Sequence, residues 1–414
     1  MAQQNAGTAG ALSGIRVLDL SGATGNYCGK LFADLGADVI LVEPLHGTEL
    51  RRAAPYAGHS LAPDAGLAFS YMNTNKRSIA LDLDTPEGQA ILHKLAGTAQ
   101  LLLETGRPGD MDARGLGYRK LSTIQPSLVY VSITPFGQTG PYAHFEADDM
   151  TLLAMSGLLS LGGYADDVPV VAYGNQAYAA GSLFAAVASM AALLDAETSG
   201  RGEHIDVSIQ ECVALALENA AQAYFLEKRV RKRYGTVQRE AGSGIFKCKD
   251  GYVYVLAGGV SANRFWELTK KWLGEAGVVG VEEFHKVRWT DRTYLATQEA
   301  KDLFSSIFDP YVVTRTKAEL YADAKRLGMA IAPVATPDEV LSSEQFRQRN
   351  YFVDVFNPVL GRTVRQPGAP YKLSETPWSI RQPAPSLGGS TAEILGELGI
   401  GAEEQAALHQ ARIV

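Results

Sequence analysis

The chain has 414 residues, of which 46% are hydrophobic and 20% are charged, and it carries a net charge of −7. This length is enough for two domains with a large core, and the composition is that of an ordinary globular protein. The acidic balance excludes the basic stripe of a nucleic-acid-binding protein, so we predict no nucleic-acid partner.

The first half of the chain alternates predicted strands and helices. Residues 1–13 show no basic region followed by an apolar run, so we expect a flexible leader rather than a signal peptide. Buried-strand patterns follow at residues 15–20, 37–44, 78–84, 101–106 and 127–137, with helices predicted at residues 30–35 and 85–95. This alternation predicts an α/β protein with a parallel sheet of the Rossmann type.

The second half begins with a helix of small residues at 179–194, a basic glycine turn and a strand at 204–209. Because Ser182 and Ser189 interrupt the apolar run and Asp195 ends it, we expect no membrane span. A charged linker or exposed helix, a hairpin and two helical stretches are predicted at residues 226–240, 246–258, 262–274 and 292–307. Residues 328–355 return to strand, helix and strand, and a short helix ends the chain.

The three cysteines, Cys28, Cys212 and Cys248, lie far apart in the sequence. This spacing disfavours both a disulfide framework and a cysteine metal site. Isolated thiols suit a reducing compartment, so we expect a cytoplasmic protein.

Five blocks of the chain resemble motifs of the family III CoA-transferases, a group that includes formyl-CoA and carnitine CoA-transferases and the α-methylacyl-CoA racemases. The blocks are residues 72–88 (MNTNKRSIALDLDTPEG), 136–142 (FGQTGPY), 171–207, 331–352 and 383–400. The resemblance implies a large Rossmann-type domain over residues 1–225, completed by residues 340–414, and a small inserted α+β domain over residues 226–339. It also implies that two chains thread through each other as an interlocked, ring-like dimer.

The family signature in residues 171–207 lacks its nucleophile. Family members carry an aspartate four residues before the glycine that corresponds to Gly181, and this chain has Ala177 there. The family aspartate attacks the acyl-CoA thioester and forms covalent intermediates, which a methyl group cannot do. Since residues 168–194 contain no Asp or Glu, no neighbouring acid replaces it. We therefore predict that this chain has no catalytic residue of its own.

The resemblance also indicates where coenzyme A would bind. Asn75, Lys76 and Arg77 follow the family pattern N-x-N-K-R-S, and Arg107 lies in a segment where the family usually has E-N-x-R-P-G. We expect these four residues to donate hydrogen bonds to the phosphates of a coenzyme A thioester, which is the substrate. The alternative is that residues 75–77 form a polar turn before a strand and that Arg107 only caps a turn.

The chain departs from the family pattern at several of these places. Thr105 and Gly106 replace the asparagine and the side chain after it, and Gly388-Gly389-Ser390 replaces G-E-H. Residues 146–149 (EADD) are acidic where transferases carry a lysine and racemases a histidine. Acidic side chains repel an anionic ligand. The thioester would then be bound weakly here, or only by a partner subunit.

Two alternatives to a chain without catalytic residues stay open. Asp148 or Asp149 could replace the missing aspartate in an active homodimer, or the chain could hold an acyl-CoA without transforming it. Acidic pairs in turns, such as this one and Asp166–Asp167, are more often solvated or cap helices. The glycines at residues 22, 25 and 29 do not have the spacing of a dinucleotide-binding loop, and the histidines show no metal-ligand spacing.

The missing aspartate and the resemblance together predict the non-catalytic subunit of a heteromeric family III CoA-transferase. A homologous catalytic subunit would supply the aspartate, while this chain would supply the scaffold and part of the acyl pocket. The implied substrates are an acyl-CoA and a dicarboxylic acid. Coenzyme A would move from succinyl-CoA to an aryl-succinate such as (R)-benzylsuccinate, with neither nucleic acid nor membrane involved.

Overall fold

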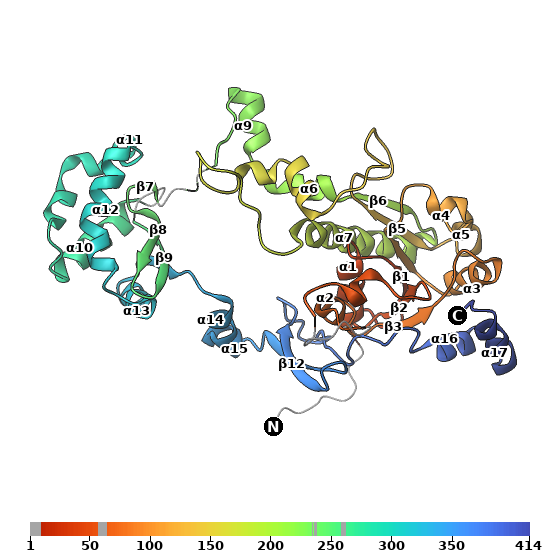
Figure 1. Ribbon diagram of the computed structural model, residues 1–414. Helices are drawn as coiled ribbons and strands as arrows, with labels where there is room; N and C mark the ends of the chain where they lie inside the picture. Colours follow the sequence, from red (N-terminus) through yellow and green to blue (C-terminus); the bar gives the residue numbers. More distant parts are fainter. Residues whose placement is uncertain (1–9, 57–63, 234, 236–237, 258–261) are drawn as a thin grey trace. The chain divides into compact units, whose positions relative to one another are not determined.

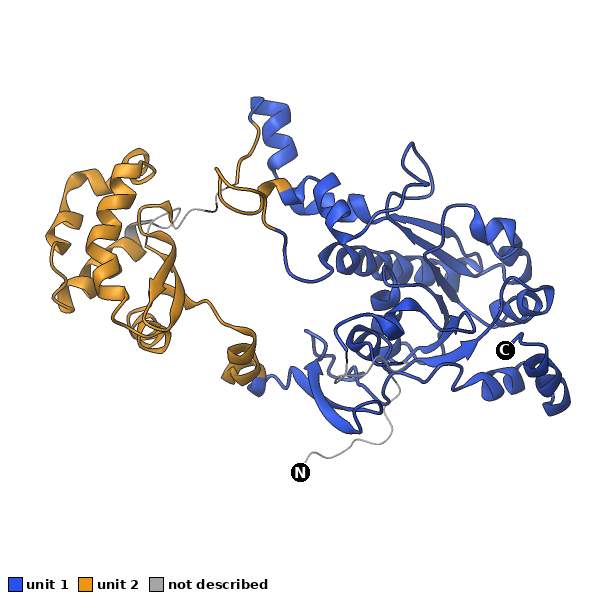
Figure 2. Ribbon diagram, in the orientation of Figure 1, with its two compact units in different colours: residues 1–159, 171–229, 347–414 blue, residues 160–170, 230–346 orange. Residues whose placement is uncertain are grey.

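The structure is a computed structural model of the chain, and it describes residues 10–56, 64–233, 235, 238–257 and 262–414 (Figure 1). The chain divides into two compact units (Figure 2). The first unit comprises residues 1–159, 171–229 and 347–414, and the second comprises residues 160–170 and 230–346. The domain limits predicted from the sequence lie at residues 226 and 339, and they remain a proposal separate from this division into compact units.

The first unit is built around a six-stranded parallel sheet with the strand order β3-β2-β1-β4-β5-β6. The strands are β1 (Arg16–Leu20), β2 (Asp38–Glu43), β3 (Arg77–Ala80), β4 (Leu101–Glu104), β5 (Val129–Thr134) and β6 (His204–Ser208). Each of them overlaps a predicted strand. The order reverses between β1 and β4, as in doubly wound sheets that bind ligands at the carboxyl ends of their strands. The predicted α/β class with a Rossmann-type sheet is confirmed.

Helices cover both faces of this sheet (Figure 1). Those of the first unit are α1 (Asn26–Asp34), α2 (Leu67–Met72), α3 (Pro86–Ala96), α4 (Asp110–Ala113), α5 (Tyr118–Ile124), α6 (Asp149–Met155), α7 (Gln176–Ser199), α8 (Ile209–Ala214), α9 (Ala220–Glu227), α16 (Thr391–Glu397) and α17 (Ala402–Gln410). One apolar cluster joins α1 and α7 to Val17, Leu103 and Val131 of the strands. A second cluster joins α3, α5 and α16 to Leu18 and Leu102, on the other face. Alternate strand residues therefore face opposite layers, as the period of a strand requires.

Helix α7 is longer than the predicted helix at 179–194, and it ends where Gly200 adopts a left-handed conformation. Because of this extension, it is the one helix in the described part of the chain that is long and apolar enough to cross a membrane. On length and composition alone this helix is weak evidence for a membrane span, so it does not overturn the expectation that the chain has none. The core helix of a soluble protein passes it too, and α7 packs against α1, α8 and β5 through buried residues such as Ala185 and Leu193.

The second unit has its own sheet and its own core. Its antiparallel sheet has the order β10-β9-β8-β7, and the hairpin predicted at residues 246–258 is formed by β8 (Ser243–Cys248) and β9 (Gly251–Leu256). The other elements are β7 (Gln238–Glu240), α10 (Ala262–Glu275), α11 (Arg292–Leu295), α12 (Gln298–Val312), α13 (Lys317–Leu327), β10 (Ala330–Pro333) and α14 (Pro337–Ser342). Stacked and edge-on rings of Trp266, Phe284, Trp289 and Phe304 fill the core.

The chain returns to the first unit through α15 (Glu344–Gln348). A two-stranded antiparallel hairpin follows, made of β11 (Phe352–Asn357) and β12 (Arg362–Pro367). The sequence analysis predicted the first of these strands and missed the second. The reason is composition: β12 reads RTVRQP and lies largely exposed, so it shows no apolar pattern.

Candidate functional site

The N-terminus of α7 carries Ala177, the residue predicted at the nucleophile position. Its side chain is fully buried in the apolar cluster between the sheet and α7. The N-cap residue of α7, Asn175, makes no side-chain cap. Instead, Asp149 Oδ1 accepts hydrogen bonds from the backbone N–H groups of Ala177, at 2.8 Å, and Tyr178, at 3.3 Å. A carboxylate therefore already occupies the positive end of this helix.

Both acids of the pair at residues 148 and 149 act as helix caps. Asp148 is the N-cap of α6, and its Oδ1 accepts hydrogen bonds from the N–H and the hydroxyl of Thr151, which lower its pKa. Burial raises the pKa of Asp149, and the hydrogen bonds from Ala177 and Tyr178 oppose this rise. Both side chains therefore cap helices, as the capping interpretation expects. Of the two, only Asp149 contacts Ala177.

The acidic pair at residues 166 and 167 lies in the second unit and is exposed. The carboxylate of Asp167 accepts a hydrogen bond from the N–H of Val168 at 2.8 Å, which is a local turn contact. This pair therefore has the solvated surroundings expected of acids in a turn.

Lys76 is buried inside the fold, and all three hydrogen-bond donors of its amino group have a partner. Its Nζ donates to Asp19 Oδ2 at 2.6 Å, to Asn73 Oδ1 at 2.8 Å and to the Asn26 carbonyl at 3.0 Å. An ammonium group has three donors, so none is left for a phosphate. A Cβ at Gly29 would overlap the Asp19 carboxylate and lie 2.9 Å from Lys76 Nζ. This buried ion pair therefore explains one glycine of the 21–29 loop without any dinucleotide.

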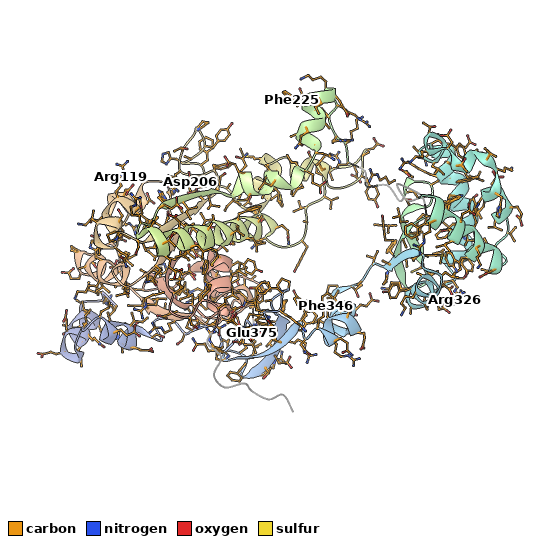
Figure 3. The ribbon with its side chains drawn as sticks, turned by 180° about the vertical axis from the view of Figure 1, so that it is seen from behind. Arg119, Asp206, Phe225, Arg326, Phe346 and Glu375 are labelled. Atoms are coloured by element: carbon orange, nitrogen blue, oxygen red, sulfur yellow. The ribbon has the colours of Figure 1, made fainter. Side chains whose placement is uncertain are left out.

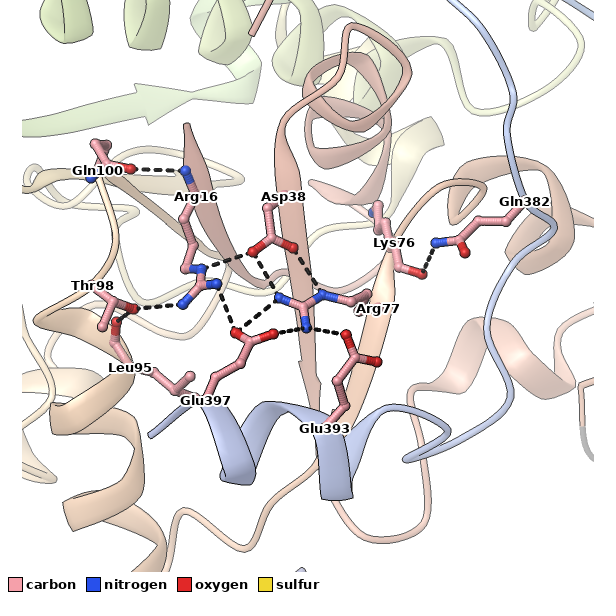
Figure 4. A network of polar contacts seen from close by, with 10 residues as sticks. All are labelled: Arg16, Asp38, Lys76, Arg77, Leu95, Thr98, Gln100, Gln382, Glu393 and Glu397. Carbon is pink, nitrogen blue, oxygen red and sulfur yellow. Dashed lines mark hydrogen bonds and ion pairs between the residues drawn. The ribbon is translucent and has the colours of Figure 1, made fainter. Parts of the chain in front are cut away.

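Arg77 lies at the first residue of β3, on the edge of the sheet opposite to the carboxyl ends of the strands. Its guanidinium binds both carboxylate oxygens of Asp38, at 2.9 and 2.7 Å, and Glu397 Oε1 at 2.6 Å. Figure 4 shows this network, which also contains Arg16 and Glu393 and fastens α16 to the strands β1–β3. The side chain therefore stabilises the C-terminal helix in this structure.

Asn75 ties a distant segment of the chain to the sheet. It adopts a left-handed backbone conformation, and its Nδ2 donates to Asp34 Oδ1 at 2.7 Å and to the Ser379 carbonyl at 2.8 Å. Its Oδ1 accepts hydrogen bonds from the N–H groups of Arg381 and Gln382. A phosphate-binding role for Asn75, Lys76 and Arg77 stays an untested prediction, and it would require these contacts to break.

Arg107 has the most accessible of the four predicted side chains. It follows β4 in the loop before α4, it is 65% exposed, and its guanidinium pairs with the carboxylate of Glu146. Arg107 and the exposed His144 both line a cavity of about 390 Å³ beside the strands β4, β5 and β6. Glu146 is one of the acids that distinguish this chain from the family pattern, and here it neutralises Arg107.

The sequence analysis missed a polar cluster on the floor of that cavity. His204 Nε2 lies 2.9 Å from the hydroxyl of Ser132, and Ser132 also hydrogen-bonds the buried carboxyl group of Glu104. The alternation of polar and apolar residues in β5 (VYVSIT) and β6 (HIDVS) is a signal that could have revealed this cluster.

Comparisons with known proteins agree with this architecture. The family described as CoA-transferase family III matches residues 12–391. The chain is 39% identical to succinyl-CoA:(R)-benzylsuccinate CoA-transferase subunit BbsE of Thauera aromatica, over 95% of each chain. It is 31% identical to the alpha subunit of succinyl-CoA–L-malate CoA-transferase of Chloroflexus aurantiacus, over 97% of this chain and 92% of that subunit. The crystal structure of a CAIB/BAIF family protein from Brucella suis superposes with a TM-score of 0.83, at 27% identity, and covers 95% of this chain and 100% of that one. On these grounds the chain belongs to the family III CoA-transferases.

Proposed function

We propose that this chain is the non-catalytic, pocket-forming subunit of a heteromeric family III CoA-transferase. The enzyme would move coenzyme A from succinyl-CoA to an aryl-succinate such as (R)-benzylsuccinate, with the nucleophilic aspartate on a homologous partner subunit. The similarity to subunit BbsE supports the substrate pair and the heteromeric assembly. The proposal also places the chain in the cytoplasm, in an interlocked dimer, and in the anaerobic breakdown of toluene.

The buried methyl group of Ala177 is the observation that carries this proposal. It lies at the start of α7, where the family resemblance puts the nucleophile, and residues 168–194 offer no other carboxylate. The carboxylate of Asp149 already accepts a hydrogen bond from the backbone N–H of Ala177. Coenzyme A would then be bound by the partner subunit, with this chain contributing scaffold and part of the acyl pocket.

Isolation of the native assembly followed by covalent trapping tests this proposal. Native mass spectrometry of the protein from its own host is expected to show a second polypeptide of similar size. Addition of succinyl-CoA and reduction of the resulting acyl-enzyme with borohydride should then modify an aspartate of that second polypeptide. A homodimer, or a modified peptide from this chain, would contradict the proposal.

Replacement of Ala177 gives a second test within this chain. We expect Ala177→Asp to create no transferase activity in the isolated chain and to lower its stability more than the isosteric control Ala177→Asn. The reason is that the added carboxylate would be buried next to Asp149, a like charge. Melting temperatures of both variants and a succinyl-CoA transfer assay measure these effects. Activity in Ala177→Asp would show instead that this chain retains a complete coenzyme A site.

The contact between Asp149 and Ala177 favours one alternative function, an active homodimer in which Asp149 is the nucleophile. A raised pKa, caused by burial, and a place at the nucleophile position are the features that support it. In that case borohydride trapping would label the peptide containing Asp149, and Asp149→Asn would abolish transfer. A third outcome, coenzyme A binding by the isolated chain without any transfer, would indicate a binding pseudoenzyme.

A further inference from the structure

The loop of residues 160–170 belongs to the second unit, although the chain on both sides of it belongs to the first (Figure 2). The chain therefore passes between the units four times, after residues 159, 170, 229 and 346. Figure 3 shows Phe225 on α9, the helix that ends just before the third of these crossings. Since so short a loop has no core of its own, contacts with residues 230–346 must fix it in the second unit.

Arg233 holds this loop by its backbone. Its Nε donates to the Tyr164 carbonyl at 2.9 Å, and its Nη2 donates to the Asp167 carbonyl at 2.8 Å. Longer hydrogen bonds run from Nη1 to the Ser160 carbonyl, at 3.2 Å, and from Nη2 to the Ala165 carbonyl, at 3.4 Å. A guanidinium group carries five donors in a rigid plane, so one side chain can bind several carbonyls at once. Because all four acceptors are backbone atoms, these bonds fix the course of the loop itself.

Gly235 adds a backbone contact to the same loop. Its N–H donates to the Gly163 carbonyl at 3.0 Å, and a Cβ at Gly235 would overlap that carbonyl. Only glycine therefore allows the two backbones to approach this closely. The loop is also closed at its ends, where the N–H of Val170 donates to the Gly162 carbonyl at 3.1 Å. Arg233 and Gly235 thus bind a compact loop rather than an open strand.

The same loop lies on the connection between α6, which ends at Met155, and α7, which begins at Gln176. These are the two helices that Asp149 joins when it accepts the N–H group of Ala177. Residues 171–176, between the loop and the first turn of α7, are all exposed. Fully extended, six residues span roughly 20 Å, so they form a short tether. A displacement of the loop can therefore pull on the start of α7.

We propose that Arg233 and Gly235 latch the α6–α7 connection to the second unit and so couple that unit to the Ala177 end of α7. When the second unit shifts, the loop moves with it and strains the hydrogen bond between Asp149 and Ala177. The second unit then controls how firmly α7 is capped at the position where the family resemblance puts the nucleophile. This coupling is a property of the folded chain and does not rest on the proposed transferase function.

Hydrogen exchange of the full-length chain, followed by mass spectrometry, tests the latch. Arg233→Gln removes the guanidinium group, and we expect exchange to rise ~10-fold or more both at residues 162–170 and at residues 177–180. Lys232→Gln is the matched control, since it removes the same charge from an exposed neighbour, and it should leave both segments within ~2-fold. A rise confined to residues 162–170 would overturn the coupling, and a rise at neither segment would overturn the latch as well.

A second pair of variants tests the latch without a change of charge. Gly235→Ala places a methyl group against the Gly163 carbonyl and should raise exchange at the same two segments by ~5-fold or more. Gly274→Ala in α10 is the control, since its methyl group would meet nothing within 4 Å, and it should change neither segment. Unchanged exchange at residues 177–180 in Gly235→Ala would contradict the proposal even if Arg233→Gln failed to fold.

Coupling between two places is reciprocal, so a change at the start of α7 should also reach the loop. Asp149→Ala should therefore raise exchange at residues 162–170 as well as at residues 177–180. The double variant Arg233→Gln with Asp149→Ala should raise exchange by less than the product of the two single effects, because each change already weakens the contact that the other disturbs. Single effects that multiply, as they do for independent sites, would overturn the proposal.

Discussion

At the residue scale, Glu104 should make the stability of the first unit depend on pH. Burial, together with Asp110 and Asp112, raises its pKa from 4.5 to about 6, against the hydrogen bonds from Ser132 and Gly106. The folded state then holds a proton that the unfolded state releases between pH 4.5 and about 6. Stability must therefore fall as the pH rises through this window. At neutral pH the ionised carboxylate costs about 2 kcal/mol.

The variant Glu104→Gln should remove this dependence. We expect it to be up to about 2 kcal/mol more stable than the unchanged chain at pH 7.5 and equally stable at pH 4.5, as measured by urea unfolding at each pH. Glu197→Gln, an exposed change at the end of α7, serves as the control and should show no such difference. A Glu104→Gln chain that is less stable at pH 7.5 would contradict the assigned direction of the pKa shift.

Variants of Lys76 and Asp19 test whether Lys76 stabilises the folded chain through its ion pair or is available to bind a ligand. Both side chains are 0% exposed, and the amino group and the carboxylate are 2.6 Å apart. Lys76→Met would leave Asp19 charged and unpaired, which typically costs 3–5 kcal/mol. The double variant Lys76→Met with Asp19→Leu should recover most of this loss, because it removes both charges. Urea unfolding of the single and double variants measures the recovery, and equal losses in both would contradict the pairing.

At the scale of single elements, the N-terminus of α7 depends on a carboxylate from another helix. Asp149 belongs to α6 and accepts the first N–H groups of α7. Asp149→Ala should therefore lower stability by about 1 kcal/mol and raise hydrogen exchange at residues 177–180. Asp148→Ala is the control, since it should loosen α6 and leave the start of α7 protected. Unchanged exchange at residues 177–180 in Asp149→Ala would show that α7 does not need this cap.

Local patterns predicted the elements better than they predicted the contacts between them. The strand at 127–137 and the helix at 85–95 follow from apolar runs and from the Thr85-Pro86 start signal, and the structure contains both as β5 and α3. The ion pair of Lys76 could not be predicted from the sequence, because its partner Asp19 lies 57 residues earlier in the chain. The same holds for the ion pair of Arg77, since its partner Glu397 comes from the far end of the sequence. Ion pairs between residues so far apart in the sequence leave no local sequence pattern from which they could be predicted.

At the scale of the whole molecule, the two units differ in how the chain builds them. The first unit needs residues 347–414 to complete it, since α16 covers the sheet and Asn75 holds residues 379–382. Apart from residues 160–170, the second unit is one continuous segment, residues 230–346, and its core contains Trp266, Trp272 and Trp289. Continuity and a separate apolar core are the conditions for independent folding.

We therefore expect a fragment of residues 230–346 to fold without the rest of the chain. Because three of the four tryptophans belong to its core, its fluorescence should be blue-shifted and should shift to the red in one cooperative urea transition. A fragment of residues 1–229 should fail to fold, since it lacks residues 347–414, which complete the first unit. Trp289→Ala in the 230–346 fragment removes a ring that stacks on Trp266 and lies edge-on to Phe284, and it should cost about 3–5 kcal/mol. A 230–346 fragment without a cooperative transition would show that its core needs contacts from outside the segment.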